Sequence, residues 1–242
     1  MSKRFRFSAG CLVLLIAFLT INTGDVKAKQ AEDEKAATVS TEGPETWYAT
    51  TYVNGAMGLH VIRYWSKGSW MRAETLLGAH PIITIVRGQD YIAFDVLEGR
   101  GARIRRSSAA VKEDESRSRP FGNELAELIA QNGVKVEETT EGDRAIEIWR
   151  KTDAAGRRKL WVTAEEPRLP IRLETFIRSG ASTITTDYSG WTRGLEIPDS
   201  FFEAPANVTL ESLDYSSFLE AATVRAIGPV LYPELLHGTP GN

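Results

Sequence analysis

The chain has 242 residues, of which 42% are hydrophobic and 25% are charged, with 20 glycines and 10 prolines. These values are ordinary for a globular protein, and they exclude collagen, a coiled-coil rod, an extended disordered chain and a polytopic membrane protein. The formal net charge of −3 argues against a general nucleic-acid-binding protein, which needs an excess of basic residues. The length suits one large domain or two small ones.

Cysteine and histidine are scarce in this sequence. Cys11 is the single cysteine, so no disulfide can form within the chain. The histidines at positions 60, 80 and 237 are widely spread, which argues against a site that holds a metal with cysteine and histidine ligands. We therefore expect no metal site.

Residues 1–28 have the pattern of a secretory signal peptide. Basic residues near the start precede an apolar run at 11–21, which is too short for a membrane-spanning helix of roughly 20 residues. Val26 and Ala28 then occupy the −3 and −1 positions of a cleavage site. We expect cleavage after Ala28 and a periplasmic protein; the alternative is an uncleaved N-terminus that anchors the chain to the inner membrane.

Cleavage at this point would change the character of the chain. It removes four basic residues and one acidic residue, so the mature net charge becomes −6. It also removes Cys11, so the exported protein must be held together by its core alone. Residues 29–45 are polar and lack aromatic side chains, and we expect a flexible leader there.

Runs of β-branched and aromatic residues begin at Thr46 and alternate with turn signals such as Asn54-Gly55. Because most connections between these runs are short, the pattern favours an antiparallel sheet whose neighbouring strands follow chain order. A large twisted sheet curls, so we expect an unclosed half-barrel of about eleven strands. The predicted strands cover residues 46–53, 59–65, 69–76, 81–87, 91–97, 102–106, 134–140, 144–151, 158–164, 170–178 and 182–191.

One helix is expected to interrupt the strand series at 120–132. It begins at a proline, carries Leu125, Leu128 and Ile129 at helical spacing, and ends before Gly133. This helix would cover the concave face of the sheet. The polar segment 107–119 before it is an ordinary surface connection or, as the alternative, a mobile flap.

The half-barrel domain is expected to span residues 46–210. An extended segment begins at Leu195 and ends near Val208. Residues 211–242 then form a C-terminal helix at 213–227, followed by a proline-containing irregular tail.

The alternation of side chains along the strands indicates what the sheet could hold. In the strand 91–97, Ile92 and Phe94 share one face, and the strand 81–87 is apolar on both faces. A curled sheet with an apolar concave face can hold an apolar ligand; the alternative is a core filled by the protein's own helices. The candidate wall of the lipid-binding cavity consists of Ile83, Ile85, Phe94, Ile148, Leu160, Leu173 and Phe176.

Sequence motifs for catalysis are missing. Residues 180–184 fail the G-x-S-x-G pattern at the last glycine, and neither H-E-x-x-H nor a P-loop occurs. The acidic residues between Glu137 and Asp143 lie on a polar strand edge and turn, not in a paired acid–base arrangement. We therefore expect a protein that is not an enzyme; a hydrolase with an unrecognised site is the remaining alternative.

Four segments carry a resemblance to a known family. They are RYWSKGSWMRAE (63–74), HPIITIVRGQDYIAFDVLEGRGARI (80–104), RKLWVTAEEPRLPIRLETFIRSGASTITTDYSGW (158–191) and IPDSFFEAPANV (197–208). In order and spacing they resemble the outer-membrane lipoprotein-sorting (LolA/LolB-like) family of bacterial periplasmic proteins. The sequence departs from that family in its long acidic leader and after Leu210.

The resemblance implies an unclosed β-barrel with a helical lid over an apolar cavity. It implies binding of the acyl chains of lipids or lipoproteins, with an envelope membrane protein as a possible partner, and neither catalysis nor a cofactor. The leading hypothesis is an exported lipid- or lipoprotein-binding carrier. The alternative is an envelope sensor or scaffold module of the same fold, with a filled core and a protein partner.

Overall fold

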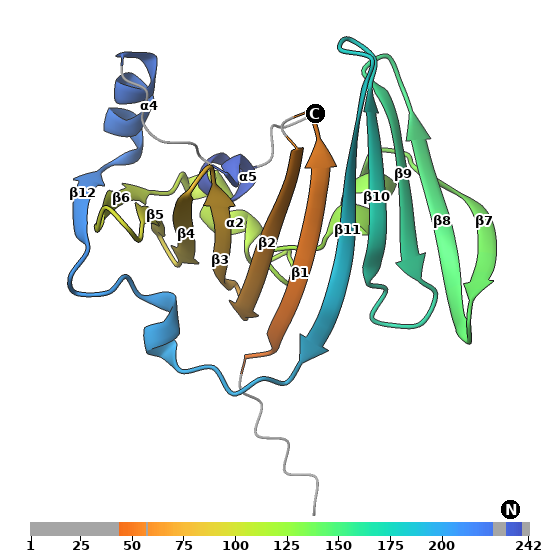
Figure 1. Ribbon diagram of the computed structural model, residues 1–242, viewed down its shortest axis with the longest axis horizontal. Helices are drawn as coiled ribbons and strands as arrows, with labels where there is room; N and C mark the ends of the chain where they lie inside the picture. The colour runs from red at the N-terminus through yellow and green to blue at the C-terminus, as the bar shows by residue number, and fades with distance from the viewer. Residues whose placement is uncertain (1–43, 57, 225–230, 239–242) are drawn as a thin grey trace, which may run out of the picture. The chain divides into compact units, whose positions relative to one another are not determined.

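The computed structural model describes residues 44–56, 58–224 and 231–238. The predicted signal peptide and nearly all of the predicted leader lie outside the described residues. The described chain forms one twelve-stranded sheet (Figure 1). Its strands are β1 (Thr46–Gly55), β2 (Gly58–Lys67), β3 (Trp70–Leu77), β4 (His80–Arg87), β5 (Asp90–Asp95), β6 (Arg100–Arg105), β7 (Val134–Glu141), β8 (Arg144–Thr152), β9 (Gly156–Thr163), β10 (Pro170–Ile177), β11 (Ser182–Arg193) and β12 (Thr209–Leu213).

The strand order is β12-β6-β5-β4-β3-β2-β1-β11-β10-β9-β8-β7. The pairing of β1 with β11 joins two antiparallel arms, one formed by β1–β6 and the other by β7–β11. The predicted half-barrel is therefore confirmed, and each of the eleven predicted strands is present. The strand β12 was not predicted; it runs parallel to β6 along an otherwise unpaired edge.

The helices differ from the predictions in position and number. They are α2 (Ser108–Glu113), α3 (Glu124–Ala130), the 3₁₀ helix η1 (Asp199–Phe202), α4 (Tyr215–Val224) and α5 (Pro233–His237). The expected connection at 107–119 contains α2, whose first turn is capped by the Ser107 hydroxyl. The tail expected to be irregular contains α5. None of the helices within the described ranges is long and apolar enough to cross a membrane.

The central helix α3 begins four residues later than predicted. Gly122 in the preceding segment has φ +71°, a conformation that glycine adopts without strain and that interrupts a helix. A Cβ atom at this position would also lie 2.6 Å from Trp191 Cη2. The segment from Pro120 to Asn123 is therefore an irregular connection pressed against the sheet.

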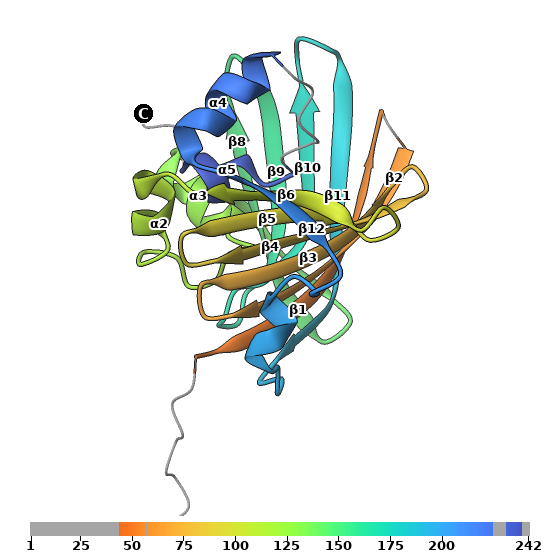
Figure 2. The same ribbon diagram turned by 90° about the vertical axis from the view of Figure 1, so that its left-hand side faces the viewer.

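Both faces of the arm formed by β1–β6 are covered. On the concave face, α5 and Phe121 pack against Tyr64 and Met71. On the outer face, an irregular segment that contains η1 packs against β3, β4 and β5 (Figure 2). We call residues 195–208 the outer segment. The prediction that the strand 81–87 is covered on both sides agrees with β4, in which the four consecutive residues 83–86 are buried.

Arg106 fastens α5 to the sheet. Its buried guanidinium donates to the carbonyl of Leu235 at 2.5 Å and to the carboxylate of Asp114 at 2.7 and 2.8 Å. A buried arginine is stable only when its donors are satisfied, and these contacts do so. β12, which crosses the predicted boundary at residue 210, and α5, which lies in the core, are thus parts of the same packed unit as the sheet.

Replacing Phe202 with alanine should destabilise the protein by about 3–5 kcal/mol, because its ring is 1% exposed and packs beside Trp70 under the outer segment. Urea unfolding followed by circular dichroism measures this loss. Leu97→Ala is the control, since that side chain is 68% exposed and should cost less than about 0.5 kcal/mol. Equal losses for the two variants would show that the outer segment does not belong to the core.

Candidate functional site

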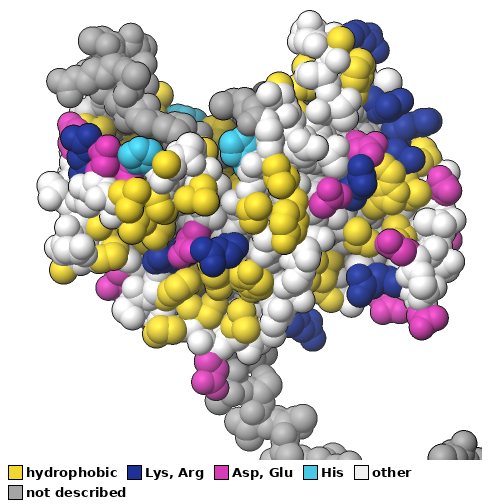
Figure 3. All heavy atoms as spheres, in the orientation of Figure 1, with side chains coloured by type: hydrophobic (Ala, Val, Ile, Leu, Met, Phe, Trp, Pro, Cys, Tyr) yellow, Lys and Arg dark blue, Asp and Glu magenta, His cyan; other side chains and the backbone are white. Residues whose placement is uncertain are grey.

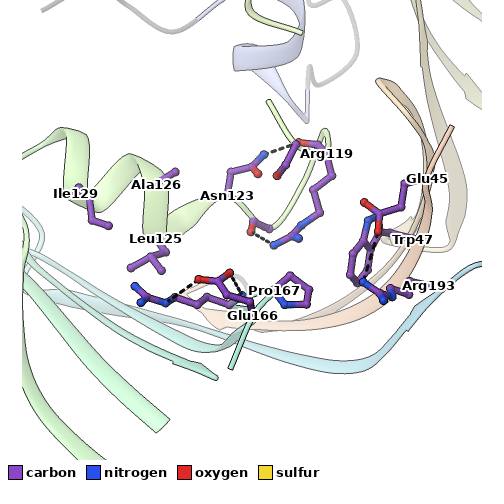
Figure 4. A pocket seen from close by; sticks show the side chains of 13 residues that line it. Glu45, Trp47, Arg119, Asn123, Leu125, Ala126, Ile129, Glu166, Pro167 and Arg193 are labelled. Atoms are coloured by element: carbon purple, nitrogen blue, oxygen red, sulfur yellow. Dashed lines mark hydrogen bonds and ion pairs between the residues drawn. The ribbon is translucent and has the colours of Figure 1, made fainter. Parts of the chain in front are cut away.

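A groove of about 660 Å³ opens between α3, the connection from β9 to β10, and the start of β1 (Figure 4). Its apolar lining comes from Trp47, Leu125, Ala126, Ile129 and Pro167. Ile129 is 47% exposed, which is unusual for a large aliphatic side chain on a helix that covers a sheet. The groove therefore offers an apolar surface that the protein does not cover itself.

Arg119 lies at the inner side of this groove and is only 7% exposed. It donates to the carbonyls of Phe121 and Gly122 at 3.0 and 2.8 Å. Its guanidinium lies 5.2 Å from the ring centroid of Trp47 and 5.0 Å from that of Trp191. Burial lowers the pKa of Arg119, but an arginine stays charged in proteins. Its contacts make Arg119 a fixed part of the wall.

Two further arginines line the groove and are paired with carboxylates. Arg168 lies 3.2 Å from Glu166 and 3.6 Å from the buried Glu147, and Arg193 lies 3.8 Å from Glu45. The pairs with Glu166 and Glu45 are partly or largely exposed, so each is weak and can exchange partners. With Arg119 included, three arginines and two glutamates line the groove, and Glu147 adds one carboxylate behind Arg168.

A second, smaller hollow lies on the concave face and shares Gly122 and Asn123 with the groove. Its volume is about 100 Å³, and we call it the inner cavity. Four aromatic side chains and three glutamates line it, together with Arg117, Pro120 and Leu235. These aromatic and acidic residues are Tyr64, Phe121, Tyr188, Tyr232, Glu124, Glu127 and Glu234.

A β-bulge positions the aromatic residues on β11. The register between β1 and β11 shifts between Tyr48 and Thr50, opposite Gly190, which has φ +67°. As a result Tyr188 and Trp191, three residues apart, both face inward and stack with ring centroids 5.6 Å apart. Without the bulge, residues at this odd spacing would lie on opposite faces.

Glu124 is the most deeply placed carboxylate of the inner cavity. One carboxylate oxygen accepts a hydrogen bond from the Tyr188 hydroxyl, and the other has no hydrogen-bond partner in the described chain. Burial raises the pKa of Glu124, and burial together with this carboxylate raises the pKa of Tyr188 well above its usual range. A perturbed carboxyl beside a cavity is typical of a functional site.

The seven predicted wall residues do not form one surface. Leu160 and Leu173 are directly opposite each other in the register of β9 and β10 and share the concave face. Ile83, Ile85 and Phe94 lie on the outer face, beneath the outer segment.

Ile148 and Phe176 also lie on the side away from Leu160. Ile148 pairs with Trp161, the neighbour of Leu160, and Phe176 lies three residues after Leu173 on the same strand. The prediction overlooked the groove itself. Leu125 and Ile129, which line the groove, were the available signal for it. Their helical spacing predicts equally well a helix that packs against the sheet.

One group of described side chains has the composition of a metal site. Ligand atoms of His80, Asp95 and Glu98 lie within 4.8 Å of one another. Asp95 accepts from His80 at 2.5 Å and from the amides of Leu97 and Glu98, while Glu98 pairs with Arg100 at 2.5 Å. These contacts satisfy the carboxylates without an ion.

No family model and no curated protein sequence matches the chain. Solved structures do resemble it. An uncharacterized conserved protein from Thermus thermophilus aligns with 77% of this chain and 99% of its own, at 11% identity and a TM-score of 0.50.

Two further solved structures are more distant. A domain assigned to outer-membrane lipoprotein sorting, from Vibrio parahaemolyticus, aligns with 72% of this chain and 95% of its own, at 12% identity and a TM-score of 0.32. The MucA/MucB complex of Pseudomonas aeruginosa aligns with 67% of this chain and 56% of the matched chain, at 12% identity and a TM-score of 0.41. The likeness to the Thermus thermophilus protein concerns the fold alone. The sheet of this chain is the unclosed half-barrel that its resemblance to LolA/LolB-like proteins predicts.

Glu124→Gln should raise the melting temperature near neutral pH, and the gain should shrink as the pH falls toward 4.5, the ordinary pKa of this group. Because burial raises the pKa of Glu124, its contribution to stability is complete below 4.5 and is lost as the pH rises through the higher folded-state value. Glutamine avoids this loss and still accepts from Tyr188. Differential scanning fluorimetry between pH 4.5 and 7 measures the two melting temperatures, and Glu141→Gln, at an exposed position, is the control. The same pH profile for both variants would refute the raised pKa of Glu124.

Proposed function

We propose that this protein is an exported lipid-binding protein that holds an acyl chain of a lipid or lipoprotein in the groove beside α3. The observation that supports it is the groove, whose volume of about 660 Å³ falls within the roughly 300–1,000 Å³ of ligand sites. The predicted signal peptide would deliver the chain to the periplasm, where lipids and lipoproteins cross between membranes.

The apolar lining supplies the affinity in this proposal. Each methylene buried against Leu125, Ile129 and the neighbouring apolar side chains contributes about 0.8 kcal/mol. The ligand is held at the mouth of the sheet, not within it, because aromatic and aliphatic side chains fill the concave face over β1–β6. This position differs from the enclosed cavity expected from the resemblance.

The arginines of the groove suit an amphiphile with an anionic head. A phosphate or carboxylate can take over the weak ion pair of Arg168 with Glu166, or of Arg193 with Glu45, and form charge-assisted hydrogen bonds. The apolar tail and the charged head would thus contact different parts of one lining. Arg119 would position the wall, because backbone carbonyls already accept from its guanidinium.

Ile129→Asp should weaken the binding of a fluorescent fatty acid at least tenfold, because it places a charge in the apolar lining of the groove. Fluorescence titration of the purified protein measures this loss, and mass spectrometry of organic extracts identifies the lipid that copurifies. Val134→Asp on β7 is the control, since Val134 is 56% exposed and lies outside the groove. A wild-type protein that carries no lipid and takes up no fatty acid would end the proposal.

A second candidate function, the binding of a protein partner, is favoured by an exposed apolar row on the outer face. Tyr52 of β1 pairs directly with Val61 of β2, and Leu76 is next to Val61 on β3. All three are large, apolar and more than two-fifths exposed. Hydrophobic side chains gather over this arm of the sheet in Figure 3. Patches of this kind mark interaction surfaces.

In this case Val61→Lys should abolish recovery of one dominant partner after photo-cross-linking in the cell envelope. Lysine introduces a charge that an apolar contact would have to bury. The control Val134→Lys changes another exposed valine, 56% exposed against 42% for Val61, that lies outside the row, and it should leave recovery unchanged. Capture that persists in Val61→Lys would exclude the outer face as the docking surface.

A further inference from the structure

We propose that the inner cavity binds a substituted ammonium group, held by the aromatic rings of Tyr64, Tyr188 and Tyr232 and by the carboxylate of Glu124. This site adjoins the groove at Gly122 and Asn123, lies on the concave face, and does not rest on the proposed function. Four observations support the proposal: the aromatic rings that line the cavity, the carboxylate oxygen of Glu124 that lacks a partner, the ion pairs of the nearby arginines, and the volume of the cavity.

Aromatic side chains surround the cavity from different parts of the fold. Tyr64 comes from β2, Phe121 from the connection before α3, Tyr188 from β11, and Tyr232 from the residue before α5. Tyr64 stacks on Phe121 at 4.9 Å between ring centroids and meets Tyr232 at 5.9 Å edge to face. Clusters of tyrosine rings attract cations through the negative faces of the rings, and they are the usual recognition device for methylated ammonium groups.

The cavity also contains polar atoms that lack a partner at hydrogen-bonding geometry. The second oxygen of Glu124 accepts no hydrogen bond in the described chain. The hydroxyl of Tyr232, which is only 7% exposed, interacts with the hydroxyl of Tyr64 but is not at hydrogen-bonding geometry to any described group. Buried polar groups are nearly always satisfied, so each exception calls for an explanation. A bound cation with acidic N–H or C–H hydrogens would meet both oxygens.

The two arginines near the cavity pair with carboxylates other than Glu124 and Glu234. Arg117 pairs with Glu113 at 2.6 Å and with Asp114 at 3.7 Å, and Arg158 lies 3.5 Å from Glu127. Neither forms an ion pair with Glu124 in the described chain. Of the three glutamates Glu127 is thus matched by Arg158, whereas Glu124 and Glu234 form no ion pair in the described chain and can attract a positively charged guest.

The volume limits the size of that guest. About 100 Å³ is the space of roughly three water molecules, at about 30 Å³ each. It admits an ammonium group with small substituents and excludes an acyl chain. The same group occurs in free amines such as choline and in lipid headgroups, so the structure defines the chemistry and the experiment must separate the two sources.

Isothermal titration calorimetry of the full chain with choline tests the proposal. Choline should bind, and its uncharged carbon isostere dimethylbutanol should bind at least tenfold more weakly, because it has the shape without the charge. Dodecylphosphocholine is the second arm: tighter binding than choline identifies a lipid headgroup as the source, and equal or weaker binding identifies a free amine. Absence of choline and dodecylphosphocholine binding, or equal binding of choline and dimethylbutanol, overturns the proposal.

Variants separate this site from the groove and from folding. Glu124→Gln should weaken choline binding at least tenfold although it is expected to raise stability near neutral pH, so a loss of binding cannot be ascribed to unfolding. Glu141→Gln makes the same change of charge on β7 and should leave binding unchanged. Ile129→Asp should leave free choline binding intact while it impairs fatty-acid uptake. Choline binding unaffected by Glu124→Gln would contradict the assigned site.

Discussion

The buried guanidinium of Arg119, held between Trp47 and Trp191, is the interaction on which the functional face depends. It joins the first strand and the last strand of the antiparallel sheet to the irregular connection before α3. Cation–π contacts of a desolvated arginine are stronger than exposed ones, and the two backbone carbonyls satisfy its remaining donors. Through this contact one residue sets the wall of the groove and the position of the inner cavity.

The two hollows follow from the way in which the sheet is covered. Along β1–β6 the concave face receives α5 and the outer face receives the outer segment, so this arm behaves as an ordinary three-layer core. Where β1 meets β11, the cover changes to the short helix α3 and its connection. A helix of seven residues cannot seal a curved sheet, and space remains on both sides of Gly122 and Asn123.

The architecture was predictable from local patterns, and the sites were not. Turn signals and β-branched runs predicted every antiparallel strand, since these depend on neighbours in the sequence. Which face of the sheet is concave was harder to predict. Ile83 and Phe94 each lie in a strand with the alternation of an apolar face, but this spacing is the same whichever side of the sheet curls inward. Glu124 could not be recognised from the sequence, because a glutamate at the start of a helix is common. Its hydrogen bond with Tyr188 depends on the tertiary fold.

The junction of β1 with β11 has a consequence for the order in which the molecule can form. Thr51 and Tyr188 are direct partners although almost the whole sheet lies between them in the sequence. Contacts of such separation close slowly because the intervening chain must first be ordered. During synthesis one side of β1 stays unpaired until the hairpin of β10 and β11 has been made, and an unpaired strand edge is a template for aggregation. Newly made molecules of this protein therefore pass through a state in which β1 must be kept from pairing with another chain.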